Sequence, residues 1–183
     1  GCVTTSIAQI MRYWSYPETG KRFHSYSHST YGTLSANFGS TTYQWTSMPN
    51  NVTSSNSAVA TLMYHVGVAV DMNYGVGSQG GSGAYVISAQ SPTTHCAEYA
   101  LKNYFGYDNT TVKGVERHNY TSSPWRALLK SELDESRPIE YAGFGSGGGH
   151  AFVCDGYDAN DFFHFNWGWS GYYDGYFEVD DLS

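Results

Sequence analysis

The chain has 183 residues, a formal net charge of −7, and 9 Lys and Arg against 16 Asp and Glu. This length suffices for the core of one domain, and 17% aromatic with only 14% charged residues excludes a disordered chain. The scarcity of basic side chains argues against nucleic acid as a partner, because Lys and Arg are needed to bind phosphates. The sequence has no run of about 18 apolar residues, so no membrane span is expected.

Helical periodicity dominates the first half of the chain. Apolar residues at helical spacing predict a first helix that ends at Tyr16-Pro17; they are Val3, Ile7, Ile10, Met11 and Trp14. Residues 20–53 are polar, aromatic and irregular, which predicts a surface loop with room for a short strand. A second helix is predicted over 56–70, with the apolar residues between Val59 and Val70 on one face, and 74–85 follow as a glycine-rich loop.

The second half repeats the helical pattern twice and then changes to strands. A third helix is predicted with Pro92 near its start, Cys96 in its middle and Gly106 as its stop. A fourth is predicted from a cap at Ser123 to Pro138. Short aromatic and β-branched runs predict four strands at 139–144, 151–157, 162–167 and 176–179. Helices followed by strands indicate an α+β fold, and with no internal repeat or linker, residues 1–183 are interpreted as a single domain.

Cys2 is the first candidate for chemistry. It stands where the first predicted helix begins, and the partial positive charge at a helix N-terminus favours the thiolate, the nucleophilic form of the side chain. Gly1 leaves room for a substrate beside the backbone. The alternative is a buried structural thiol, which is the usual state of an unpaired cysteine.

His150 follows the small residues 145–149 and precedes a predicted strand, so it can face a cleft and take a proton from a thiol. Asn166 can accept a hydrogen bond from the imidazole and fix its tautomer, and Trp167 can shield that bond from water. Taken singly, these residues could instead be a hydrogen-bonded turn histidine and a packed aromatic pair. Cysteine, histidine and asparagine in this order and at this spacing are typical of papain-like cysteine proteases.

The remaining candidates indicate neither a cofactor nor a metal. The glycines before His150 lack a following Gly-Lys-Ser/Thr, so a phosphate site is not expected. The other histidines share no ligand spacing, and His95 and Cys96 are predicted on different helix faces, so no zinc site is expected. Cys96 and Cys154 are predicted as core residues, and Asp71 as a turn residue.

The chain resembles the streptopain family of secreted bacterial cysteine peptidases. The matching runs follow the family's order from one end to the other: 1–5, 8–11, 71–75, 100–107, 148–153, 166–169 and 174–177. The resemblance implies a papain-like fold with a helical side, an antiparallel β-sheet side and the active cleft between them. Cys2 would be the nucleophile and His150 the general base and then acid, while Asn166 and Trp167 would orient and shield the histidine.

The resemblance also implies how substrates are bound and how the enzyme is made. The walls of a substrate pocket would come from two short runs: Ser82, Gly83 and Ala84, and Gly147, Gly148 and Gly149. Protein or peptide substrates would be cut with a preference for a bulky apolar residue two positions before the cut. An N-terminal prodomain would inhibit the zymogen, and the enzyme would be secreted or held at the bacterial cell surface.

Two departures from the family pattern stand beside these expectations. The family pattern implies a segment ahead of the cysteine, with an oxyanion-hole glutamine, and a further strand after Ser183; residues 1–183 begin after the first and end before the second. Another papain-like acyl transferase, such as a transglutaminase or a toxin-processing peptidase, is one alternative function. From a different class, a catalytically silent papain-like or carbohydrate-binding module would also suit the low charge and the many aromatic residues. Fast reaction of Cys2 with iodoacetamide or E-64 separates the enzyme from the silent module.

Overall fold

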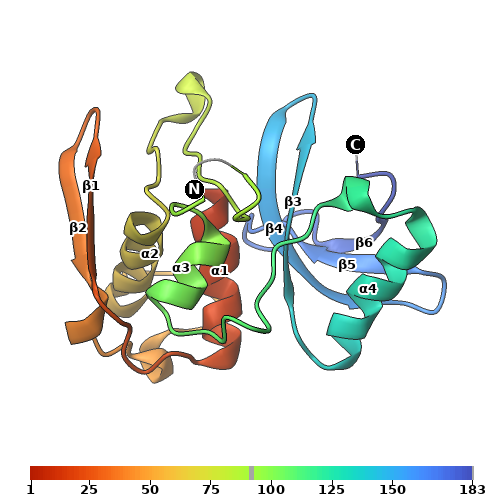
Figure 1. Cartoon of the computed structure of the whole chain (residues 1–183), viewed down its shortest axis with the longest axis horizontal. Coiled ribbons are helices and arrows are strands. Elements are labelled where there is room, and N and C mark those ends of the chain that lie inside the picture. The colour runs from red at the N-terminus through yellow and green to blue at the C-terminus, as the bar shows by residue number, and fades with distance from the viewer. Residues whose placement is uncertain (91–92, 183) are drawn as a thin grey trace. The chain divides into compact units, whose positions relative to one another are not determined.

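The structure, a computed structural model, describes residues 1–90 and 93–182 (Figure 1). Its contacts divide the chain into two compact units: one comprises Gly1 and Val3–Gly114, and the other comprises Cys2 and Val115–Ser183. The predicted α+β class is confirmed, because the described residues contain both α-helices and antiparallel sheets. Within those residues, the helices are too short or too polar to cross a bilayer.

Helix α1 (Cys2–Trp14) begins at the residue where the sequence placed it. Ser15 ends the helix in the left-handed conformation at φ 48° and donates its N–H to the Arg12 carbonyl oxygen at 3.2 Å. The predicted apolar face is buried from Val3 to Met11. Trp14, the last helical residue, is the exception. Its ring packs edge-to-face on the exposed Tyr13, and 44% of its surface stays exposed.

The segment 20–53 is more ordered than its sequence predicted. Strands β1 (Phe23–His28) and β2 (Gly32–Asn37) form an antiparallel hairpin, and two 3₁₀ turns follow, η1 (Phe38–Ser40) and η2 (Trp45–Ser47). The prediction of a surface loop was therefore wrong for most of this segment. The strands escaped detection because their side chains are mostly polar and half-exposed, so no apolar alternation marks a buried face.

Helix α2 (Ser57–Ala69) confirms the predicted second helix and organises the first unit. The Asn56 side chain caps it by accepting a hydrogen bond from the Val59 N–H at 3.0 Å. The helix contacts both strands of the hairpin and helix α3 (Ala97–Asn103), as Figure 1 shows. Between α2 and α3 the glycine-rich loop is confirmed; it contains a short 3₁₀ turn, η3 (Gly77–Gln79), and isolated β-bridges at Gly83 and Tyr85.

Helix α3 starts later than predicted. Cys96 is its N-cap, not a mid-helix residue, and the Cys96 Sγ accepts a hydrogen bond from the Tyr99 N–H at 3.4 Å. A cysteine is an unusual N-cap, so the residue types did not indicate that the helix begins there. The expected role of Pro92 at the start of this helix lies outside the described residues. Gly106 follows the helix end at φ 70°, as a stop signal should.

The second unit pairs one helix with one sheet. A 3₁₀ turn, η4 (Arg117–Asn119), leads to helix α4 (Ser122–Asp134), whose N-cap is Thr121. Ser123 therefore lies inside the first turn, and the predicted cap was wrong by two residues. The helix contacts strands β3 (Ile139–Gly145) and β4 (Gly148–Tyr157), as Figure 1 shows.

Strands β5 (Phe162–Asn166) and β6 (Gly175–Glu178) complete the antiparallel sheet, in the order β3-β4-β5-β6. All four predicted strands are present, although β4 begins at Gly148, ahead of the predicted 151. The register places Gly143 opposite His150 and Val153 opposite Asn166. The buried core of this unit comprises Trp125, Leu129, Tyr141, Phe152, Cys154, Phe163, Phe165 and Val179.

Candidate functional site

The position of Cys2 depends on close packing around its neighbour, Gly1. A Cβ built on Gly1 would lie 2.8 Å from the Met72 Sδ and 3.1 Å from the Ser82 Cβ, so a larger residue there would require the Met72 side chain to shift. The Gly1 carbonyl then accepts the Thr5 N–H at 3.1 Å and starts α1. Cys2 is thus the first helical residue, half-buried, at the end of the helix where backbone N–H groups favour an anion.

The other two cysteines lack the setting of a nucleophile. Cys96 and Cys154 are both completely buried, as predicted, and all three cysteines are thiols. Burial raises the pKa of the Cys154 thiol to about 12, so it stays protonated at neutral pH. Cys2 is the only one of the three with solvent access.

His150 lies within β4, where Gly143 faces it across the sheet. Its Nε2 is 2.9 Å from the carbonyl oxygen of Trp167. A carbonyl can only accept a hydrogen bond, so Nε2 carries the proton in the neutral ring and Nδ1 keeps a lone pair. The structure therefore gives His150 the tautomer that a general base needs at Nδ1.

Aromatic rings surround the imidazole. Trp169 stacks on it with centroids 4.8 Å apart and planes 25° apart, and Phe152 stacks at 5.7 Å. Trp167 is nearly parallel to the ring but farther away, at 6.2 Å. The shielding role of Trp167 stays a prediction, and the tryptophan that stacks closer on the imidazole is Trp169. The signal for it was present, since both tryptophans belong to the same four-residue run.

Asn166 ends β5 and begins the turn that carries the Trp167 carbonyl. Its Oδ1 accepts a hydrogen bond from the Gly168 N–H at 2.9 Å, and Gly168 has φ 76°, a conformation suited to glycine. The atom that meets His150 Nε2 is therefore the backbone oxygen of the following residue. A direct hydrogen bond from His150 to the Asn166 amide stays a prediction.

The two runs expected to form a substrate pocket lie in different units. In the first unit, the Ser82 Oγ accepts a hydrogen bond from the Gly75 N–H at 3.2 Å, and Gly83 bridges to Asn73; Ala84 continues this loop. In the second, Gly147 precedes β4, and Gly148 and Gly149 are the first two residues of that strand. The substrate-binding role of these residues stays a prediction.

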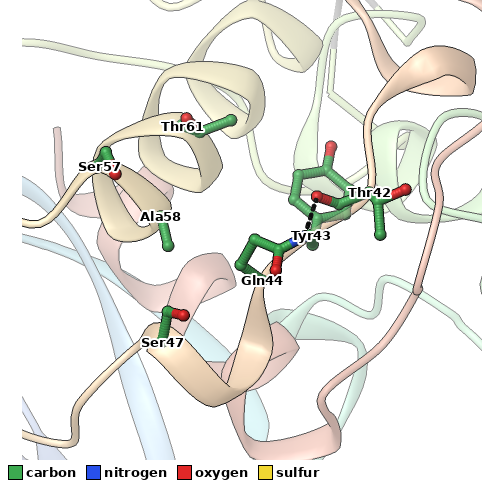
Figure 2. A pocket seen from close by; sticks show the side chains of 7 residues that line it. All are labelled: Thr42, Tyr43, Gln44, Ser47, Ser57, Ala58 and Thr61. Atoms are coloured by element: carbon green, nitrogen blue, oxygen red, sulfur yellow. Dashed lines mark hydrogen bonds between the residues drawn. The ribbon is translucent and has the colours of Figure 1, made fainter.

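The first unit also contains a pocket of about 180 Å³, and none of these residues lines it (Figure 2). Its lining is uncharged: Thr42, Tyr43, Gln44, Ser47, Ser57, Ala58 and Thr61. The Tyr43 hydroxyl is bonded to His65 Nδ1 at 3.0 Å, and burial raises the pKa of this tyrosine. The lining therefore offers polar contacts but no group suited to nucleophilic or acid–base chemistry at neutral pH.

Asp71 joins two histidines that sequence spacing had not connected. Its carboxylate is 2.5 Å from His24 Nε2 and 3.5 Å from His95 Nδ1. These residues come from β1, the end of α2 and the approach to α3, so only folding brings them together. Within residues 1–90 and 93–182, they and the other His, Cys, Asp and Glu side chains form no cluster suited to holding a metal ion.

Comparison with known proteins gives a consistent result. The model of the Peptidase C10 family matches residues 1–177. Streptopain of Streptococcus pyogenes is 36% identical over 195 residues, which cover 100% of this chain and 46% of streptopain. The thiol protease/hemagglutinin PrtT of Porphyromonas gingivalis is also 36% identical, and the match covers 20% of that protein. The chain thus spans about half the length of streptopain.

Two solved structures from Prevotella intermedia are similar over 98% of this chain. Active wild-type interpain A cysteine protease has a TM-score of 0.84 at 41% identity, and the match covers 74% of that chain. A prointerpain A fragment has a TM-score of 0.83 at 40% identity, with 56% of that chain covered. These similarities confirm the predicted papain-like α+β fold.

Proposed function

Because the chain belongs to the Peptidase C10 family, we propose that it forms the catalytic part of a cysteine-type endopeptidase, with Cys2 as nucleophile and His150 as base. The hydrogen bond between His150 Nε2 and the Trp167 carbonyl carries this proposal, because it leaves Nδ1 free to accept a proton. In addition, Cys2 is the one of the three cysteines with solvent access.

The proposed reaction proceeds through an acyl-enzyme. The Cys2 proton passes to His150 Nδ1, and the sulfur bonds to the carbonyl carbon of the scissile peptide. His150 then gives this proton to the leaving nitrogen as the carbon–nitrogen bond breaks. In the second half, water gives a proton to His150 and its oxygen to the acyl carbon. The carbon–sulfur bond breaks, and the thiol is restored.

Asn166 is assigned a positioning role in this mechanism. Its side chain holds the turn at Gly168, and the turn presents the Trp167 carbonyl to His150. The loss of one such hydrogen bond typically costs about 1 kcal/mol, or roughly tenfold at most in rate. Asn166→Ala should therefore keep measurable activity, unlike the loss of Cys2 or His150.

The biological setting is proposed from the relatives. Prointerpain A is a precursor by its name, which supports an inhibitory prodomain ahead of the catalytic part. The relatives come from bacteria, and secretion or display at the cell surface is proposed for this protein as well. Its substrates are proposed to be proteins, cut with an apolar residue two positions before the scissile bond.

Labelling of the full chain with E-64, followed by mass spectrometry, tests the proposal. One adduct on Cys2 is expected in the folded protein. Cys2→Ala should lose the label and casein hydrolysis together, and His150→Ala should lose the hydrolysis. Cys96→Ser is the matched control, because a hydroxyl can still cap α3, and it should keep both. If no cysteine reacts, the silent-module alternative holds; if Cys96 or Cys154 reacts faster, Cys2 is not the nucleophile.

A further inference from the structure

Three exposed aromatic side chains lie between β5 and β6: Trp169, Tyr172 and Tyr173, here called the aromatic loop. Their exposed fractions are 51%, 68% and 69%. The rings of Tyr172 and Tyr173 meet edge-to-face at 4.9 Å. Neither ring contributes to the core of its unit. Large apolar surface that remains in water indicates a place where something binds.

The backbone holds the aromatic loop in one conformation. The Asp174 carboxylate accepts the Trp167 N–H, and the Tyr173 carbonyl accepts the Trp167 indole N–H, both at 3.0 Å. The Tyr172 N–H donates to the Trp169 carbonyl, also at 3.0 Å. Tyr173 itself has φ 63°, a conformation that a bulky residue rarely adopts. The surrounding hydrogen bonds therefore hold the backbone from which the two tyrosines project.

The aromatic loop begins at the proposed base. The Trp169 ring stacks on His150 with centroids 4.8 Å apart. Tyr172 lies close to Trp169 in the loop, because its backbone N–H donates to the Trp169 carbonyl at 3.0 Å. The nitrogen that leaves in the first half of the reaction must come within hydrogen-bond reach of His150. Substrate residues that follow this nitrogen, at about 3.4 Å each when extended, can therefore reach the loop.

We propose that the aromatic loop binds the part of the substrate that follows the scissile bond. On this proposal, Tyr172 and Tyr173 favour aromatic and aliphatic side chains at the second and third residues after the cut. The inference rests on the proposed function, because it takes His150 as the proton donor to the leaving nitrogen. The loop residues 167–174 contain no Lys or Arg, and the Asp174 carboxylate lies beside them, so acidic substrate side chains should be disfavoured.

Two substrate series separate binding after the cut from catalysis itself. The first consists of quenched-fluorescence peptides with one fixed sequence before the cut and Phe, Leu, Gly or Asp at the second and third residues after it. The second has the same sequence before the cut, followed directly by aminomethylcoumarin. For each substrate series, kcat/KM is measured with the full chain, with Tyr172→Ala and with Tyr173→Asn. Asparagine is used at position 173 because it tolerates a positive φ.

Phe and Leu peptides should lose about two- to tenfold in kcat/KM in either variant, the range of a single aromatic contact. Gly peptides and the coumarin series should stay unchanged, and Tyr172→Phe should restore the preference. Tyr31→Ala is the control, because Tyr31 is an exposed tyrosine of the first unit at 59%. Equal losses in both series, or no loss in either, would overturn the inference. If the unmodified chain cleaves neither series and Cys2 takes no E-64, it is the proposed function that has failed.

Discussion

Truncation of Trp167 tests how the structure supports His150. The side chain packs on Phe152 at 4.5 Å and on Phe177 at 5.4 Å, and its indole N–H donates to the Tyr173 carbonyl at 3.0 Å. Complete truncation of a tryptophan to alanine typically costs about 3–5 kcal/mol. Trp167 is only half-buried, so we expect Trp167→Ala to cost about 3–4 kcal/mol, of which the indole hydrogen bond supplies about 1.

A second variant separates the contribution of ring packing to this free energy from that of the indole hydrogen bond. Trp167→Phe keeps an aromatic ring but loses the N–H, so it should cost about 1–2 kcal/mol. For a chain of this size, each kcal/mol shifts Tm by about 2–4 °C, which predicts a fall of roughly 6–16 °C for alanine and roughly 2–8 °C for phenylalanine. Thermal unfolding followed by circular dichroism at constant pH measures both values.

The two variants should differ in activity in the same order as in stability. The group that meets His150 Nε2 is the backbone oxygen of residue 167, which both substitutions retain. Below the Tm of each variant, Trp167→Phe should keep kcat within about tenfold of the original chain, while Trp167→Ala should lose more, because the turn is less firmly packed. Equal falls in Tm for the two variants would refute the packing argument. A complete loss of activity in Trp167→Phe would refute the assignment of the backbone carbonyl.

Two further predictions concern the first unit. Burial lowers the pKa of His65, so the unfolded chain takes up a proton near the ordinary value of 6.5 while the folded chain does not, and stability should fall as pH drops below about 6.5. His65→Gln keeps an acceptor for the Tyr43 hydroxyl and cannot be protonated, so it should flatten the dependence of Tm on pH between about 7 and 5; an unchanged slope would contradict this. Gly67→Ala should destabilise the protein by about 1–3 kcal/mol, although alanine favours helices, because its Cβ would lie 2.0 Å from the Tyr74 hydroxyl. Gly77→Ala meets open space and should change stability by less than about 0.5 kcal/mol; urea titration of both variants measures the two values, and equal effects at the two glycines would count against the clash.

Elements whose signals are local could be predicted from the sequence. The apolar spacing from Val3 to Met11 and the tyrosine-proline step after Trp14 are properties of adjacent residues, and α1 has the predicted bounds. The four strands of the second unit were also found, because short aromatic runs separated by Gly, Asp and Asn turns are local patterns as well. The order of helices and then strands indicated the α+β class, the family resemblance added the papain-like fold, and the comparisons confirm both.

Elements held by distant partners were missed or misplaced. The β1–β2 hairpin has few apolar residues of its own, and α2 packs against both of its strands. The cap of α3 is a cysteine, and that of α4 lies two residues before the serine that the sequence favoured. Such choices depend on which hydrogen bonds and buried contacts the folded chain can satisfy together, and no short window of sequence contains that information.

For the candidate site, the sequence by itself determined which side chains are proposed to carry chemistry: a thiol at a helix start, and a histidine followed by Asn166 and Trp167. Tertiary structure alone decided what holds the histidine. The partner of His150 Nε2 is the backbone carbonyl of Trp167. Every residue has such a carbonyl, so this partner could not be predicted from residue types. The pairing of β4 with β5 and the turn at Gly168 bring that oxygen to the ring. The position of the Asp71 carboxylate between His24 and His95 was likewise set by folding, because three segments distant in sequence must meet before these side chains come within reach of one another.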